Sequence, residues 1–138
     1  MDDILSTLET TLRYLKVPVS KGSHPQGLDS AVVERLALKL AVDEPFVLQL
    51  TNIRARTYQR RKSEKALLTQ TESDRVLRVA RIAQEAERVF ESPEKARGWL
   101  SKKSAVLGGA LPLELLGTDA GARDVEAELT RIEWGDFA

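Results

Sequence analysis

The 138-residue chain contains no cysteine, is 42% hydrophobic and 30% charged, and balances 21 basic against 21 acidic side chains. The lack of cysteine excludes disulfides, thiolate metal sites and cysteine nucleophiles. The start, Met-Asp-Asp-Ile, is acidic where a secretion signal is basic, and no run of about 18 apolar residues occurs. We therefore expect a cytoplasmic protein without a membrane span.

The zero net charge hides a segregation of charge along the chain. Residues 1–53 hold 5 basic and 7 acidic side chains, residues 54–81 hold 9 and 3, and residues 82–138 hold 7 and 11. A basic centre between acidic ends indicates an anionic partner for the middle of the chain and a different partner for its C-terminal part.

The N-terminal segment predicts one helix and a linker. Residues 2–16 place leucines at helical spacing, whereas residues 17–27 contain two prolines and two glycines. The only histidine, His24, lies in this linker. A single histidine without neighbouring ligands is expected to be an ordinary surface residue, because metal and catalytic sites need a cluster of groups.

Three helices are predicted next. They cover residues 28–40, capped by Ser30; residues 43–50, capped by Asp43; and a basic segment from about residue 54. The second and third are separated by Thr-Asn-Ile, in which Asn52 suits the left-handed backbone of a tight turn. This outline is typical of a helix-turn-helix.

The third of these helices is strongly basic, with six basic side chains against one acidic between Arg54 and Lys65. Side chains near the start of a recognition helix reach base edges, and flanking cations neutralise phosphates. Tyr58 either donates to a phosphate or packs inward. A solvated basic face paired with acidic residues of the tail is the alternative. The candidate DNA-contacting residues are Arg54, Arg56, Thr57, Tyr58, Arg60, Arg61 and Lys62.

Residues 68–90 predict a long helix with an apolar arc too wide for one neighbour to cover. Its start fits a capping box of Thr69 with Glu72, or a second frame of Thr71 with Asp74. Because a basic segment precedes this helix and an acidic one follows, we interpret it as the joint between two functional halves.

The C-terminal part predicts three short elements and a final helix. These are a helix from Ser92-Pro93 to Leu100, a loop over residues 101–110, a short helix over 112–116, and a last helix capped by Thr118 with Gly135 just past its end. Trp99 is expected in the core. Gly108 and Gly109 permit close approach to a neighbouring helix or to a partner.

The tail carries two aromatic residues, Trp134 and Phe137. Exposed termini rarely carry two aromatics unless these dock, either on the protein's own core or on another chain. No nucleophile–base pair, metal-ligand cluster or phosphate-binding glycine spacing is evident. We therefore expect a binding protein with two surfaces, not an enzyme, and no cofactor, metal or small-molecule substrate.

Several spaced motifs agree with one known family. They are Leu-Thr-x-x-Glu-Ser-Asp-Arg-Val-Leu-Arg-Val-Ala at 68–80, Glu-Lys-Ala-Arg-x-Trp-Leu at 94–100, Leu-Gly-Gly-x-x-Pro-Leu-Glu-Leu-Leu at 107–116 and Thr-Asp-x-Gly-x-x-x-Val at 118–125. Together they resemble the toxin-binding domain of Xre/MbcA/ParS-type antitoxins. Residues 53–61 resemble the third helix of the family's Xre-like helix-turn-helix. Asn52 and Arg54 depart from it, since the family often has glycine and serine there, so the operator sequence cannot be carried over.

The resemblance implies an all-α protein with an N-terminal Xre-like helix-turn-helix and a C-terminal helical toxin-binding domain. The implied parts are a DNA-binding region over 28–66 and a toxin-binding domain over 67–138. Residues 1–27, the predicted N-terminal helix and linker, have no counterpart in the family, and their role stays open. It also implies an antitoxin of a type II toxin–antitoxin system. Such an antitoxin blocks the cleft of a RES-domain toxin, which consumes NAD or ADP-ribosylates a target, and represses its own operon, usually as a homodimer.

On this resemblance the toxin-binding residues lie in the glycine-containing loop, the last helix and the tail. They are Lys102, Lys103, Leu107, Gly108, Gly109, Leu111, Pro112, Leu113, Glu114, Asp119, Arg123, Glu133, Trp134, Asp136 and Phe137. The alternative function is a stand-alone helix-turn-helix transcriptional regulator whose C-terminal half only dimerises.

Overall fold

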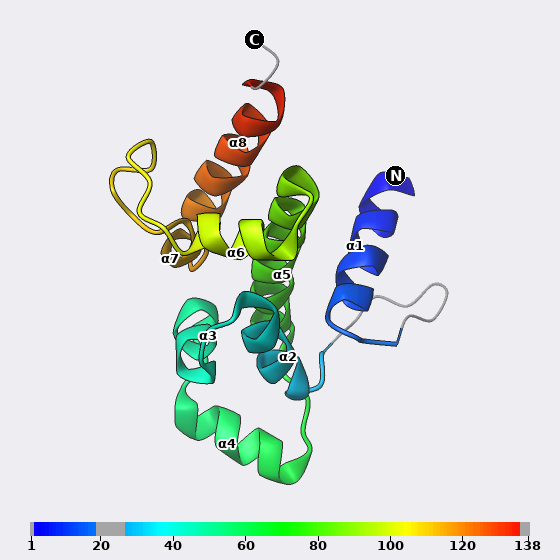
Figure 1. Cartoon of the computed structure of the whole chain (residues 1–138). Coiled ribbons are helices and arrows are strands. Elements are labelled where there is room, and N and C mark those ends of the chain that lie inside the picture. The colour runs from blue at the N-terminus through cyan, green and yellow to red at the C-terminus, as the bar shows by residue number, and fades with distance from the viewer. Residues whose placement is uncertain (1, 19–26, 136–138) are drawn as a thin grey trace. The chain divides into compact units, whose positions relative to one another are not determined.

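The computed structural model describes residues 2–18 and 27–135 (Figure 1). The helices are α1 Asp2–Tyr14, α2 Ala31–Leu40, α3 Glu44–Thr51, α4 Ala55–Glu64, α5 Gln70–Phe90, α6 Pro93–Leu100, α7 Pro112–Leu115 and α8 Asp119–Gly135. In these residues the only β-pairing is two isolated bridges, Asp29 with Leu67 and Ser104 with Ala110. The predicted all-α class is confirmed. Three residues discussed above, His24, Asp136 and Phe137, lie outside the described residues.

The chain divides into two compact units, Met1–Arg81 (unit 1) and Ile82–Ala138 (unit 2). The division falls within α5, so each unit contains part of that helix. Unit 1 contains α1 to α4, and unit 2 contains α6 to α8.

Unit 1 has a core built mainly from the apolar stripes of α2 and α3, which pack on each other. Its fully buried side chains include Leu15, Val32, Val33, Leu36, Val47, Tyr58 and Val76. The segment after α1 is tied to α2, because the Arg35 guanidinium donates to the carbonyls of Leu15 at 3.3 Å and Lys16 at 3.2 Å.

The predicted start of α2 is wrong. The helix begins at Ala31, not at Leu28, and Ser30 makes no capping hydrogen bond. Instead the Asp29 carboxylate accepts from the Ala31 N–H at 2.8 Å. Leu28 is kept out of the helix because its carbonyl accepts from the Leu68 N–H at 2.8 Å and its N–H donates to the Ser73 hydroxyl at 2.9 Å.

The connection between α3 and α4 agrees with the prediction. Asp43 caps α3 by accepting from the Phe46 N–H at 3.0 Å. Asn52 takes the left-handed conformation, with φ of 54°, and ends the helix. Residues 52–54 then lead into α4, whose N-cap residue, Arg54, makes no side-chain cap. The sequence therefore forms the helix, tight turn and second helix that define a helix-turn-helix.

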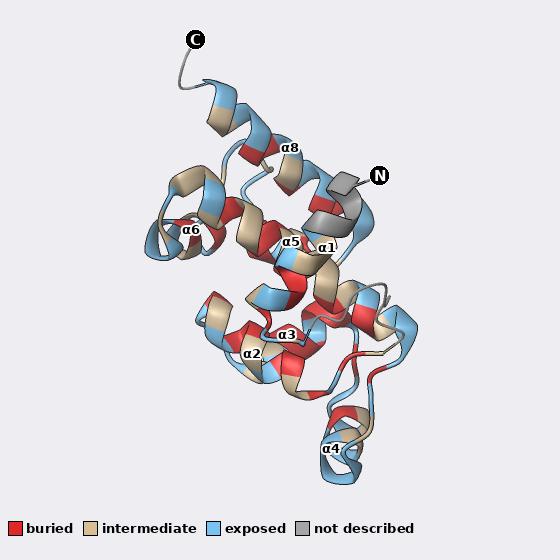
Figure 2. Cartoon of the chain, turned by 90° about the vertical axis from the view of Figure 1, so that its right-hand side faces the viewer, coloured by how far each residue is buried: buried red, intermediate tan, exposed pale blue. Residues whose placement is uncertain are grey.

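The long helix α5 starts with the first of the two predicted capping frames. The Glu72 N–H donates to the Thr69 hydroxyl at 3.1 Å, and the Glu72 carboxylate accepts from the Thr69 N–H at 2.8 Å. Its broad apolar arc is buried, as Figure 2 shows along much of the helix. The buried members are Val76, Val79, Ala80, Ile82, Ala83 and Ala86.

In unit 2 the two predicted helix caps are present. Ser92 accepts from the Lys95 N–H at 3.2 Å, and Thr118 accepts from the Gly121 N–H at 3.0 Å. The last helix α8 includes Gly135, which was expected just past its end, so the predicted end is one residue early. Trp99 is half-buried, and its ring centroid lies 5.7 Å from that of Phe90.

Candidate functional site

Helix α4 has an inner side that is engaged within unit 1. Tyr58 is only 1% exposed, and its hydroxyl donates to the Glu44 carboxylate. Burial and this hydrogen bond raise the pKa of the Tyr58 phenol. Of the two predicted orientations, Tyr58 therefore takes the inward one. Its inclusion among the predicted DNA-contacting residues is wrong, because the side chain is buried and its hydroxyl is bonded to Glu44 of α3.

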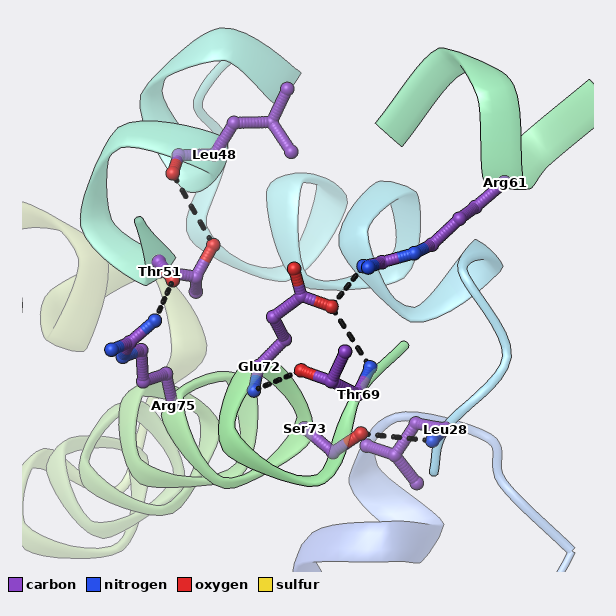
Figure 3. Close-up of polar contacts among 8 residues, drawn as sticks. All are labelled: Leu28, Leu48, Thr51, Arg61, Thr69, Glu72, Ser73 and Arg75. Atoms are coloured by element: carbon purple, nitrogen blue, oxygen red, sulfur yellow. Dashed lines mark hydrogen bonds and ion pairs between the residues drawn. The ribbon is translucent and has the colours of Figure 1, made fainter. Parts of the chain in front are cut away.

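Arg61 also faces inward, where it pairs with Glu72 of the α5 capping box (Figure 3). Both side chains are largely shielded from water, with exposed fractions of 14% and 13%. Partial burial opposes ionisation of Glu72, but the hydrogen bonds from Thr69 and the Arg61 guanidinium lower its pKa. One carboxylate thus caps α5 and anchors the C-terminal end of α4, so Arg61 is not a free cation.

The Glu72 carboxylate predicts a pH-dependent contribution to stability. Because folding lowers its pKa, the contribution is complete above the unfolded value of about 4.5 and is lost as pH falls through the lower folded value. We expect Glu72→Gln to cost roughly 1–3 kcal/mol at pH 7, since it removes a charged hydrogen bond. Glutamine still fits the capping box. Chemical denaturation at pH 7 and pH 3 should show the difference between the two proteins closing at the acidic pH.

The outer side of α4 is exposed (Figure 2). Arg54, Arg56 and Arg60 of the predicted DNA-contacting set lie there, whereas Thr57 is half-buried. Lys62 is also exposed, but its ammonium lies 5.8 Å from the centroid of the inward-facing Tyr58 ring. The exposed residues also include Gln59, which the sequence analysis did not select. Its position three residues after Arg56 is the signal that could have found it, because residues three apart share a helix face. This side presents an exposed cationic surface with hydrogen-bonding capacity.

In unit 2 the segment between α6 and α7 forms a closed loop. The Ser104 N–H donates to the Ala110 carbonyl at 3.0 Å, and the Gly109 N–H donates to the Ser104 carbonyl at 2.8 Å. Gly108 and Gly109 have φ of 73° and 83°, a region that favours glycine. A Cβ added at either would meet nothing within 4 Å. The glycines therefore serve the turn and face outward, and they do not provide close packing inside the chain.

The loop presents apolar surface to solvent at its tip. Val106 is 64% exposed, and Leu107 is half-buried. Beside the tip lies a groove of about 480 Å³ between the loop, the end of α7 and α8, lined by Val106, Leu107, Leu115, Asp124, Ala127, Glu128 and Arg131. Val106 and Asp124 were not among the predicted toxin-binding residues, because neither belongs to a recognisable motif.

The predicted toxin-binding residues divide by exposure. Lys102, Lys103, Gly108, Gly109, Glu114, Asp119, Arg123 and Trp134 are exposed, and Leu107, Leu111 and Glu133 are half-buried. Pro112 and Leu113 are buried, so their selection as surface contacts is wrong. They start α7, which packs on α6 and α8, and their side chains belong to the unit 2 core.

Glu133 is engaged within unit 2. Its carboxylate accepts two hydrogen bonds, each of 2.8 Å, from the Arg88 guanidinium of α5. These bonds lower the pKa of Glu133. Its neighbour Trp134 is 69% exposed. The end of α8 therefore combines an internal ion pair with an aromatic side chain that is available to a partner.

The described residues contain no group of three or more histidine, aspartate and glutamate side chains arranged to hold a metal ion. In the same part of the chain, no helix is both long enough and apolar enough to cross a membrane. The candidate sites in these residues are two surfaces: a basic face on α4 and an apolar, glycine-containing loop in unit 2.

Comparison with protein families matches two parts of the chain to known domain types. Residues 25–81 match the antitoxin Xre-like helix-turn-helix domain, and residues 85–135 match the antitoxin Xre/MbcA/ParS C-terminal toxin-binding domain. The chain thus belongs to the class of proteins that join a helix-turn-helix to a toxin-binding domain.

Individual relatives extend the assignment over most of the chain. It is 31% identical over 129 residues to an antitoxin Xre of Photorhabdus laumondii, covering 89% of this chain and 87% of the relative. An antitoxin Xre of Yersinia enterocolitica is 30% identical, with 91% and 89% covered. A protein of Sphingobium named Prs ADP-ribosylating antitoxin is 27% identical, with 91% and 85% covered.

The chain therefore belongs to the Xre antitoxin family and is an antitoxin of a toxin–antitoxin system. The family assignment favours this function over the stand-alone regulator. It also implies a partner type for each domain, DNA for the helix-turn-helix and a toxin for the C-terminal domain.

Proposed function

We propose that the chain neutralises a RES-domain toxin, which consumes NAD or ADP-ribosylates a target, by covering the toxin's active-site cleft with unit 2. The exposed loop over residues 104–110 carries this proposal. A loop fixed by its own backbone hydrogen bonds, with an apolar tip, can enter a cleft at low entropic cost. The name of the Sphingobium relative, an antitoxin described as Prs ADP-ribosylating, supports a toxin of this chemistry.

The acidic side chains of unit 2 also support the proposal that it covers the toxin's cleft. A cleft that holds the pyrophosphate of a dinucleotide is electropositive, and acidic side chains complement it. The exposed Glu114 of α7 supplies such a carboxylate, and Asp119 is exposed at the start of α8. Trp134, exposed near the end of α8, is the kind of aromatic residue that dominates interface energetics.

The second part of the proposal is that α4 binds the operator of the antitoxin's own operon and represses it. Support comes from the exposed cations of α4 and from the match to a helix-turn-helix domain. A homodimer is proposed because paired recognition helices read two half-sites one helical turn apart. Toxin neutralisation and repression then depend on different units of the chain.

One experiment separates the two activities. Cells carry an inducible RES toxin, the antitoxin and a reporter under the operon's promoter. Changing Val106 to Asp together with Trp134 to Ala should remove protection, because loss of a central apolar contact costs about 2–4 kcal/mol of binding. Repression should persist in that variant. The double variant Arg56→Ala, Arg60→Ala should show the opposite result. Growth, cellular NAD and reporter output are measured.

The control for the loop variant is Leu38→Asp, which places the same charge on another exposed apolar side chain, in α2. It should retain protection. If the loop variant protects as well as the unchanged chain, occlusion by this loop is wrong. If the α4 double variant still represses fully, the assignment of the operator surface to α4 is wrong.

A further inference from the structure

The outer side of α4 contains a polar stripe with a neutral amide at its centre. Arg56, Gln59, Arg60 and Ser63 follow the spacing i, i+3, i+4, i+7, which places them on one face of the helix. All four are exposed. Within residues 2–18 and 27–135, the hydrogen bonds and ion pairs of α4 side chains engage Tyr58 and Arg61 but none of these four. The stripe is therefore available to an external partner.

The stripe begins at the start of α4. Arg56 is the second residue of the helix and Gln59 the fifth. Three residues of α-helix advance about 4.5 Å along the axis, which is close to the rise of one base pair, about 3.4 Å. A helix lying in the major groove with its N-terminal part against the bases would bring both side chains within reach of neighbouring base pairs.

Contacts on the inner side of α4 fix the direction in which this stripe faces. Tyr58 is held by Glu44 of α3, and Arg61 is held by Glu72 of α5. These two contacts lie about one turn apart on the inner side of α4, and they tie it to two different helices, which restricts its rotation about its own axis. A base-reading residue needs such a supporting shell, because side chains must be held close to their productive geometry.

The uncharged amide of Gln59 is suited to recognise a base and cannot neutralise a phosphate. The cations on α4 can neutralise phosphates regardless of sequence, but Gln59 adds no charge. Its amide offers one donor and one acceptor, which match the N6 and N7 of adenine. The guanidinium of Arg56 matches the O6 and N7 of guanine.

Resting on the proposed operator binding, we infer that Gln59 selects an adenine in each half-site and Arg56 a guanine at a neighbouring base pair. Lys62, at the flank of the stripe, and Arg54, at its entry, contact phosphates. The operator class is thus a duplex whose half-sites contain a guanine and an adenine on adjacent or next-adjacent pairs.

The test starts from the full-length chain and a library of duplexes with a randomised 20-base-pair centre. Selection is repeated with Gln59→Ala, Gln59→Glu and the control Lys62→Ala. Gln59→Ala should lose the preference for one adenine in each half-site, by about 10- to 100-fold, and keep the others. Gln59→Glu should shift that position toward cytosine, whose N4 amino group donates to a carboxylate. Lys62→Ala should keep the selected motif and bind with a smaller salt slope.

A base analogue supplies a second readout that a general loss of affinity cannot mimic. Replacing the selected adenine by 7-deaza-adenine removes the N7 acceptor. The unchanged chain should bind this duplex about 10-fold more weakly, and Gln59→Ala should bind both duplexes equally. The inference is overturned if Gln59→Ala selects the same motif as the unchanged chain. If the unchanged chain enriches no sequence, the proposed operator binding fails and this inference fails with it.

Discussion

Gly121→Ala is expected to lower the free energy of unfolding by about 3 kcal/mol or more, the largest effect that we predict for a single methyl group. A Cβ at this position would lie 2.1 Å from the Leu115 carbonyl oxygen and 2.9 Å from the Leu115 carbonyl carbon. Backbone atoms cannot yield as a flexible side chain can, so α7 and the start of α8 must separate. Thermal and urea unfolding followed by circular dichroism measure the loss.

The chain offers a matched control for this substitution. Gly98 lies in α6, is exposed, and an added Cβ would meet nothing within 4 Å. Because alanine favours a helix over glycine, Gly98→Ala should stabilise the protein by about 0.5–1 kcal/mol. Equal effects of the two substitutions would show that the close approach of α7 to α8 does not control stability.

Tyr58→Ala is expected to destabilise the protein by about 3–5 kcal/mol, since it empties the space of a buried aromatic ring. Tyr58→Phe keeps the ring and removes only the hydrogen bond to Glu44, so it should cost about 1 kcal/mol. The two variants are compared by urea denaturation at pH 7. Tyr58→Ala should cost more than Tyr58→Phe because the ring is part of the core, whereas the hydroxyl only faces the half-buried Glu44 carboxylate.

Tyr58→Phe also distinguishes an internal residue from a DNA contact. If the hydroxyl is used only by Glu44, operator affinity well below the unfolding temperature should stay within twofold of the unchanged chain. Loss of a hydrogen bond to phosphate would instead weaken binding to every sequence by about 1 kcal/mol, roughly fivefold, without changing the salt slope, because the phenol carries no charge. That result would place the phenol on the DNA side and contradict its burial.

Features set by local chemistry were predictable from the sequence. Asp43, Ser92 and Thr118 cap their helices as expected, because a cap needs only a short polar side chain next to the first free N–H groups. The capping box of Thr69 with Glu72 formed for the same reason. The predicted cap at Ser30 did not form, because the adjacent Asp29 carboxylate accepts from the Ala31 N–H instead. The helix start is also fixed by the distant hydrogen bonds of Leu28 with Leu68 and Ser73.

Features set by contacts between distant residues were not predictable. The burial of Tyr58 depends on Glu44, 14 residues away in the chain. Arg61 finds its partner 11 residues on, and Arg88 finds Glu133 across 45 residues. Nothing in the local pattern separates Arg61 from its exposed neighbour Arg60. Composition indicated a basic helix, and only the packing of that helix divides its cations into structural and available ones.

The residues at several helix ends of this chain lower its free energy of unfolding. Among the described residues, Lys16, Ala41, Asn52, Lys65 and Glu91 all adopt positive φ, near 55°. For residues other than glycine and asparagine this conformation costs about 1 kcal/mol. The chain is therefore less stable at four helix ends, those at Lys16, Ala41, Lys65 and Glu91, than it would be with glycine there. Each of these four helix ends is therefore a position at which glycine should raise the free energy of unfolding.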